Sequence, residues 1–147
     1  MATIVSWEGP ENAKVMLIGQ NPGSEEARQG RPFVGRSGKY LDTVLAKNGI
    51  DRGRLYITSV VKETTQANRI PTAREIGYWM PNLLQEIRRI KPKIVVLMGK
   101  VAWETPRLDG IEYIETCHPA AALRFPKPRE RFESDFEMLA GKIAGLY

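Results

Sequence analysis

The sequence predicts an α/β domain in which a mainly parallel sheet is covered by helices on both faces. Two observations support this class. Short apolar runs rich in Val, Ile or Leu have the length of strands, and their continuous apolar character is typical of strands buried on both faces. Helical patterns separate these runs, and this alternation implies right-handed crossovers between parallel strands. The predicted strands are Val15–Gly19, Leu55–Val61, Ile94–Gly99 and Ile111–Cys117.

The first predicted strand, Val15–Gly19, ends at a glycine and leads into a long polar stretch that continues to Gly35. This stretch shows no helical period for about a dozen residues, so we expect a functional loop at the carboxyl end of a strand. A helix is predicted next, where Leu41, Val44 and Leu45 recur at helical spacing. Asn48-Gly49 is its C-terminal signal.

Two longer helices are predicted in the rest of the chain. Thr72 and Glu75 have the spacing of a capping box, and an apolar face then continues to a stop at Lys91-Pro92. The last helix carries apolar residues on one side, at Phe132, Phe136, Leu139, Ala140 and Ile143. No repeat or linker divides the 147 residues, so we expect one domain that spans residues 1–147.

Composition narrows the class of protein. The chain is 42% hydrophobic and 27% charged, which is typical of soluble globular proteins. No apolar run approaches a membrane span and no leader follows Met1, so we expect a cytoplasmic protein without a membrane partner. Cys117 is the one cysteine, which excludes an internal disulfide, and we interpret it as an inert core residue. The net charge of +5 is compatible with a nucleic-acid partner but is weak support alone.

Polar residues follow the predicted strands, and the carboxyl ends of parallel strands share one edge of a sheet where ligands bind. His118 follows the last strand and precedes Pro119, and it is the only histidine in the chain. A lone histidine is more often structural, but its position opposite the Asn21 loop favours function. An imidazole can donate a hydrogen bond to an oxygen that gains negative charge in a transition state.

The long loop contains two segments of interest. Asn21-Pro22-Gly23 has residue types that favour a simple turn, but the length of the loop and its glycines speak for function. Phe33 lies in a polar setting and is either a local core plug or a stacking platform for a flat ligand. The loop lacks the Gly-Lys-Ser/Thr ending of a phosphate loop and the glycine pattern of dinucleotide-binding turns.

Cations gather just after the His118-Pro119 turn, at Arg124, Lys127, Arg129 and Arg131. Charged residues that approach a helix are usually solvated surface, but these adjoin the candidate site. They favour an anionic ligand, and a phosphate backbone is one such ligand.

The ordered motifs resemble the uracil-DNA glycosylase superfamily, and most closely its iron–sulfur branch, family 4. The resemblance covers nearly the whole chain and implies a three-layer α/β/α sandwich around a four-stranded parallel sheet. The motifs are Ala13–Gly19, Asn21-Pro22-Gly23, Gly30–Gly35, Gly38, Tyr56–Lys62, Asn68–Pro71, Lys91-Pro92-Lys93, Gly99, His118-Pro119 and Leu123-Arg124.

The resemblance implies a monofunctional glycosylase that flips a damaged base out of DNA, hydrolyses its N-glycosidic bond and acts in base excision repair. Its partner would be DNA that contains a damaged base, uracil first. The implied catalytic residues are Asn21 and His118, where His118 would stabilise charge on the departing base. Residues implied to bind the base or the adjoining sugar are Gln20, Gly23, Phe33 and Ser59. Residues implied to bind DNA are Lys62, Leu123, Arg124, Lys127 and Arg129.

Departures from the family pattern modify this expectation. The chain begins too late for the first pair of cluster cysteines, and Glu63 and Trp79 stand where the second pair aligns, so we expect no iron–sulfur cluster and no metal. Ser59 replaces the asparagine that reads uracil, and Ala120 replaces a serine after His118-Pro119. Asn21 has no useful basicity, so it would position water rather than act as a general base, and we expect a modest rate.

These departures leave alternatives open. The enzyme could act on hypoxanthine or another deaminated base, because a serine hydroxyl does not reproduce bidentate pairing with uracil. The chain could instead be a DNA-binding module that has lost catalysis. A small-nucleotide enzyme on a doubly wound fold is a third interpretation, supported only by the loops at the strand ends. We expect a monomer.

Overall fold

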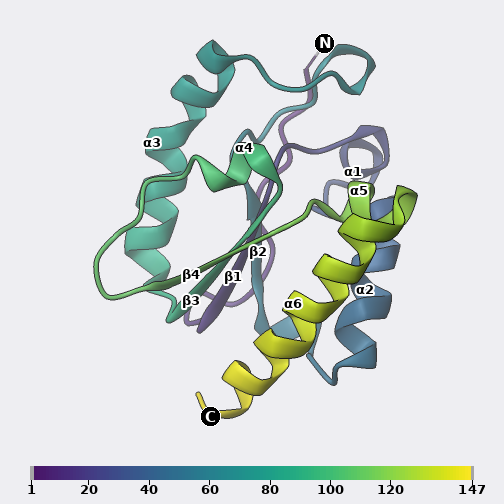
Figure 1. Cartoon of the computed structure of the whole chain (residues 1–147). Coiled ribbons are helices and arrows are strands. Elements are labelled where there is room, and N and C mark those ends of the chain that lie inside the picture. Colours follow the sequence, from purple (N-terminus) through teal and green to yellow (C-terminus); the bar gives the residue numbers. More distant parts are fainter. Residues whose placement is uncertain (1, 147) are drawn as a thin grey trace.

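The computed structural model describes residues 2–146, which form one central sheet and helices on both of its faces (Figure 1). The strands are β1 (Val15–Gly19), β2 (Tyr56–Ser59), β3 (Ile94–Met98) and β4 (Glu112–Thr116). The α-helices are α1 (Ser24–Gln29), α2 (Arg36–Lys47), α3 (Ala73–Ile90), α4 (Lys100–Trp103), α5 (Pro119–Arg124) and α6 (Pro126–Ala144). Within residues 2–146, no helix combines the length and apolar character needed to cross a membrane.

The sheet is parallel throughout, with strand order β2-β1-β3-β4, which confirms the predicted class. In the register, Leu17 of β1 lies between Ile57 of β2 and Val96 of β3. The chain adds β2 on one side of β1 and then crosses to add β3 on the other side. Such a reversal of strand order opens a crevice at the carboxyl ends of the strands, where ligands bind in open α/β sheets.

Helix α3 covers one face of the sheet, and α2 and α6 cover the other face (Figure 1). Alternate side chains of β1 pack to opposite faces, as the strand period requires. Val15 and Leu17 join the core under α2 and α6, whereas Met16 and Ile18 join the core under α3. The predicted three-layer α/β/α sandwich is therefore confirmed.

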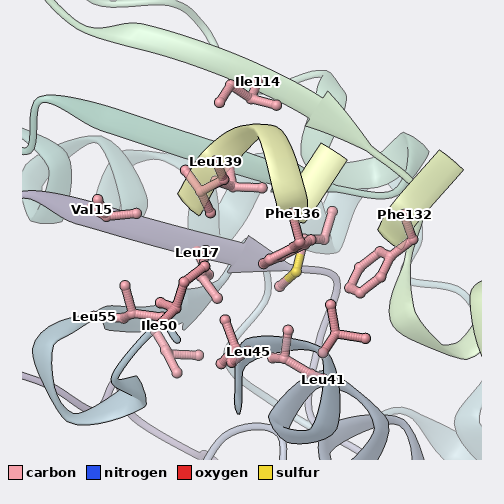
Figure 2. Close-up of a cluster of buried hydrophobic side chains, with 14 of the residues drawn as sticks. Val15, Leu17, Leu41, Leu45, Ile50, Leu55, Ile114, Phe132, Phe136 and Leu139 are labelled. Atoms are coloured by element: carbon pink, nitrogen blue, oxygen red, sulfur yellow. The ribbon is translucent and has the colours of Figure 1, made fainter. Parts of the chain in front are cut away.

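Figure 2 shows the core between the sheet and helices α2 and α6, where side chains distant in sequence interdigitate. Leu41 and Leu45 of α2 face Leu17, and Phe132 and Phe136 of α6 complete the cluster with ring centroids 4.5 Å apart. Fully buried aromatic side chains of this size dominate core energetics, so this cluster fixes α2 and α6 on the sheet.

The predicted helix boundaries agree with the structure where local capping chemistry sets them. Thr72 and Glu75 form the predicted capping box at the start of α3, and that helix ends as Lys91 adopts a left-handed φ of 52°. Helix α2 ends at Lys47 with Asn48 as its C-cap, and Gly49 follows with a φ of 68°. These signals are encoded within a few residues of each helix end.

Two expectations about local structure were wrong. The polar stretch after β1 contains helix α1, whose one buried residue is Glu26, so it has no apolar period that the sequence could reveal. Strand β4 is not buried along its length, because its Glu112 and Glu115 are exposed at the edge of the sheet, whereas β2 at the opposite edge is buried throughout. An edge strand borders solvent, where charged side chains are tolerated.

Candidate active site

A pocket of about 380 Å³ opens at the carboxyl ends of the strands, where the strand order reverses. It brings together side chains that are far apart in the sequence. Gln20 and Asn21 follow β1, Ser59 ends β2, and His118 follows β4. Phe33, from the loop between α1 and α2, forms another part of the wall. Amide, hydroxyl, imidazole and aromatic groups therefore face one cavity.

Phe33 is both packed and presented to the pocket. The residue is 9% exposed and belongs to the core cluster, yet it also lines the cavity. The ring lies so close to the backbone of Gly19 that a Cβ at that position would be 2.3 Å from Phe33 Cζ. On the pocket side, the ring centroid is 6.0 Å from that of His118, with an interplanar angle of 37°. The ring can support a flat ligand beside the imidazole.

Glu26 organises the loop on both sides of the pocket. Its carboxylate accepts hydrogen bonds from the backbone N–H groups of Gly23 at 3.0 Å, Val34 at 2.9 Å and Gly35 at 2.7 Å. The Glu26 side chain is buried, and these three N–H groups supply the hydrogen bonds that a buried carboxylate requires. One carboxylate thus holds the Asn21-Pro22-Gly23 segment at a fixed distance from the Phe33 segment.

His118 is held as a neutral hydrogen-bond donor. It is the N-cap of α5, where its Nδ1 accepts the backbone N–H of Ala120 at 3.0 Å. Burial lowers the pKa of His118 to about 4, although the negative charge of Glu26 acts in the opposite direction. Because Nδ1 carries the accepting lone pair, the proton of the neutral ring resides on Nε2. Gly99 backs the residue closely, since a Cβ there would be 2.9 Å from His118 Cβ.

The two amides after β1 form a short chain at the pocket wall. Gln20 Nε2 donates to Asn21 Oδ1 at 3.3 Å, and Asn21 Nδ2 lies 3.4 Å from the carbonyl oxygen of Glu63 and 3.5 Å from Thr65 Oγ1. The amide nitrogen is therefore directed toward acceptors in the protein. A carboxamide oxygen accepts two hydrogen bonds, so Asn21 Oδ1 retains capacity for a water or ligand.

Ser59 is buried at the end of β2, and its hydroxyl is already committed. Its Oγ donates to the carbonyl oxygen of Val61 at 2.7 Å. A hydroxyl has one proton and two lone pairs, so Ser59 presents only acceptor capacity to the pocket. This property restricts which base edges the residue can pair with.

Lys62 does not lie where a phosphate could reach it, which corrects the expected DNA contact. The residue is 4% exposed, and its Nζ donates to the carbonyl oxygen of Ser59 at 2.7 Å and contacts Glu86 Oε1 at 2.7 Å. Burial lowers the pKa of Lys62, and the attraction of Glu86 only partly opposes this effect. The ammonium group is a buried structural charge beneath β2.

Two of the other expected DNA-binding residues line a second depression of about 420 Å³ beside the pocket. Leu123 and Arg124 line it, and Arg124 also lines the first pocket. Arg129 is exposed, but its guanidinium donates to the carbonyl oxygens of Ala122 and Leu123 at 3.0 Å each, at the end of α5. Lys127 is exposed in the first turn of α6 and lines neither cavity.

Sequence reasoning did not identify several pocket residues. Val5 comes from the N-terminal segment, which pairs with Lys62 through a backbone hydrogen bond of 2.8 Å. Glu26 is a charged residue in a polar stretch, and nothing in the sequence indicates that it is buried beside the pocket. Asn68 begins the Asn68–Pro71 motif and lines both cavities. Its φ is 56°, and the preceding Ala67 has a φ of 55°. Two successive non-glycine residues in the left-handed region are unusual and often mark functional sites. This conformation is visible only in the folded backbone, so the sequence did not point to Asn68.

The residues present do not fit the iron–sulfur cluster expected of family 4, the branch that the sequence resembles most. At the positions aligned with cysteines, Trp79 Nε1 donates to Glu63 Oε1 at 3.2 Å, and an indole N–H offers no lone pair. Cys117 is half-buried, packs against the core under α2 and α6, and burial raises the pKa of its thiol. Among residues 2–146, no group of three or more His, Cys, Asp or Glu is placed to hold a metal ion.

Comparisons with known proteins agree with this architecture. The sequence profile described as the uracil DNA glycosylase superfamily matches residues 6–140. A type-4 uracil-DNA glycosylase from Pyrobaculum aerophilum is 33% identical over 93% of this chain and 82% of its own length. A type-4 uracil-DNA glycosylase from Thermotoga maritima is 39% identical over 82% of this chain and 72% of its own length.

The fold also resembles a solved structure. The solution structure of a candidate uracil DNA glycosylase from Methanosarcina acetivorans matches with a TM-score of 0.61 at 16% identity. The match covers 95% of this chain and 99% of that one. At this identity the likeness establishes a common fold, because fold and function vary separately.

Proposed function

The chain belongs to the uracil DNA glycosylase superfamily, and from this premise we propose that it flips a deaminated base, uracil first, out of DNA and hydrolyses its N-glycosidic bond. It is a DNA glycosylase by relationship, with a role in repair of uracil-type damage. A base inside the duplex stack cannot be reached, so it must enter a pocket such as the one beside Phe33.

The neutral His118 beside Phe33 is the observation that carries the proposal. As the N-glycosidic bond breaks, its electron pair passes to the base and negative charge develops on a base carbonyl oxygen. An Nε2–H group that is already fixed in position stabilises this charge without reorganisation. Phe33 would stack on the ring and so hold the carbonyl near the imidazole.

Asn21 would orient the water that completes the reaction. Its Oδ1 has capacity to accept a hydrogen bond from a water molecule next to the sugar. The bond from C1′ to the base nitrogen breaks with its electron pair on the base, the water oxygen forms the new bond to C1′, and the proton that the water releases passes to the departing base anion or to solvent. Because a carboxamide has little basicity, Asn21 contributes position rather than proton abstraction.

Ser59 bears on the choice of base. With its proton given to Val61, the hydroxyl can accept a hydrogen bond but cannot donate one to a base carbonyl. Uracil and hypoxanthine both carry a ring N–H next to a carbonyl, so both suit such an acceptor. Hypoxanthine is therefore the second candidate substrate, and the committed hydroxyl of Ser59 is the observation that favours it.

The direct test is incubation with oligonucleotides that each contain one uracil, hypoxanthine or xanthine, in single-stranded and double-stranded form. Alkali-labile cleavage at the modified position is the expected result, with uracil or hypoxanthine fastest. Absence of product from every substrate, together with salt-sensitive DNA binding, would instead support the DNA-binding module without catalysis. Binding of free nucleotides but not oligonucleotides would support the small-nucleotide enzyme.

The pH profile should show that His118 acts in its neutral form. Since its pKa is lowered to about 4, the ring stays neutral above that value, and kcat/KM is expected to be flat from about pH 5 to pH 8. A histidine with an unshifted pKa near 6.5 would lose about thirtyfold between pH 8 and pH 5 if only the neutral form were active. The measurement is the ratio of kcat/KM for wild type to that for His118→Ala at each pH. This ratio cancels the pH dependence contributed by other titrating groups.

Replacing Ser59 by asparagine should shift preference toward uracil. The asparagine adds a donor and an acceptor, so kcat/KM for uracil should rise about tenfold relative to hypoxanthine. Ser59→Ala is the matched control, because it removes the hydroxyl without adding a donor. If Ser59→Asn and Ser59→Ala give the same ratio between the two bases, Ser59 does not read the base edge.

A further inference from the structure

Arg52 lies outside the pocket but binds the loop that carries Phe33. It opens the short 3₁₀ turn of Arg52–Arg54 ahead of β2, and its side chain is 17% exposed. The guanidinium donates to the carbonyl oxygen of Pro32 at 2.7 Å and to that of Phe33 at 2.9 Å. One planar group thus spans two consecutive carbonyls.

These two carbonyls belong to the peptide groups on either side of the Phe33 Cα atom. The relative orientation of these peptide planes is what the φ and ψ angles of Phe33 describe. Phe33 has a φ of 50°, in the left-handed region that non-glycine residues seldom adopt. A bulky residue keeps such a conformation only when its surroundings hold it.

The peptide group between Phe33 and Val34 is held on both sides, at its carbonyl oxygen and at its N–H. Its carbonyl oxygen, on Phe33, accepts from Arg52, and its N–H, on Val34, donates to Glu26. Arg52 is itself oriented by carboxylates: its Nη1 contacts Asp42 at 2.6 Å and its Nε contacts Glu8 at 3.3 Å. A guanidinium fork fixed in this way fits two acceptors, which an ammonium group would not do with the same geometry.

We propose that Arg52 is a positioning residue that holds Phe33 in its left-handed conformation, so that the ring lies beside His118 and receives the flipped base. The inference rests on the proposed function for its kinetic consequence. Arg52 does not touch the base and acts through Phe33. Its loss should therefore affect the step after DNA binding, in which the base enters the pocket, and not the contacts with the DNA backbone.

The test compares Arg52→Met with Arg31→Met as the matched control. Arg31 pairs with the same Glu8 carboxylate at 2.6 Å and shows no contact with either loop carbonyl, so its replacement removes one charge and one ion pair next to the same acid. We expect Arg52→Met to lower kcat about tenfold or more with KM changed less than about threefold, whereas Arg31→Met stays within about twofold of wild type. A kcat for Arg52→Met within that same range would overturn the proposal.

A double-mutant cycle with Phe33→Ala separates a positioning role from a general loss of structure. If Arg52 acts through the ring, Arg52→Met should cost less than about twofold in the Phe33→Ala background. Independent effects that multiply would overturn the proposal. Arg52→Lys keeps the charge but not the fork and should remain impaired, and it serves as the second test if Arg52→Met does not fold.

Hydrogen exchange gives a readout that does not depend on activity. The amides of Val34 and Gly35 should exchange faster in Arg52→Met than in wild type, with no change in Arg31→Met. Unchanged exchange at these amides in Arg52→Met would overturn the inference. If wild-type protein releases no base from any oligonucleotide, the proposed function fails, and the exchange measurement alone decides whether Arg52 holds the loop.

Discussion

Replacing His118 by alanine is expected to lower kcat on the preferred DNA by about two to three orders of magnitude. The imidazole Nδ1 accepts the N–H of Ala120, which leaves the proton of the neutral ring on Nε2 for a hydrogen bond to the base. Loss of one fixed donor to a developing negative charge costs about 3 to 4 kcal/mol of transition-state stabilisation. The affinity for uncleaved DNA should change little, because backbone contacts dominate that affinity.

Single-turnover rates and DNA affinities of three variants would test this role. His118→Gln supplies an N–H donor and should recover part of the rate that His118→Ala loses. Asn21→Ala should also lower the rate far more than the affinity, because its amide orients water rather than the DNA strand. If His118→Ala and Asn21→Ala lose rate and affinity in equal measure, these residues only hold the loops.

Replacing Lys62 by methionine is expected to lower the free energy of unfolding by about 3 to 5 kcal/mol, the largest stability effect we predict. The substitution leaves the Glu86 carboxylate buried without its cation. Glu86 also accepts from Tyr56 Oη at 2.7 Å and Thr58 Oγ1 at 3.1 Å, so it cannot move to solvent without breaking those bonds. Urea denaturation of the variant and wild type measures the difference.

The double variant Lys62→Met with Glu86→Gln is the control. Glutamine keeps an acceptor for the Tyr56 and Thr58 hydroxyls but carries no charge, so at least half of the lost stability should return. The lowered pKa of Lys62 supports this expectation, because burial destabilises the charged ammonium group more than Glu86 stabilises it. Removing both charges should therefore cost less than removing the lysine alone. If the double variant is as unstable as Lys62→Met alone, the loss comes from packing of the lysine side chain.

Local signals in the sequence were sufficient for much of the fold. Val15–Gly19 and Ile94–Met98 are continuous apolar runs because both faces of each strand are buried. Thr72 and Glu75 define the start of α3 through hydrogen bonds between residues three apart. Asn21 and His118 were found because parallel strands present their carboxyl ends at one edge, so loop residues after different strands converge there.

Contacts between distant residues decided the rest. The sequence suggests that Lys62 is a surface cation, but the fold buries it beside Glu86. From the sequence, Ser59 is a candidate base contact, and only the fold places its Oγ 2.7 Å from the carbonyl oxygen of Val61, to which it donates. Arg52 shows no sign in the sequence of its bonds to the Phe33 loop.

The physical reason is the range of each interaction. Periodicity and capping report the burial and hydrogen bonding of neighbours in the chain, and so the sequence by itself determined the strands, the main helices and the convergence of Asn21 and His118 on one rim. The partner of a charge or hydroxyl depends on which segments the folded chain brings together. Only the tertiary structure therefore decided that Lys62 is structural, that Ser59 is an acceptor, and that Arg52 and Glu26 hold the loop that carries Phe33.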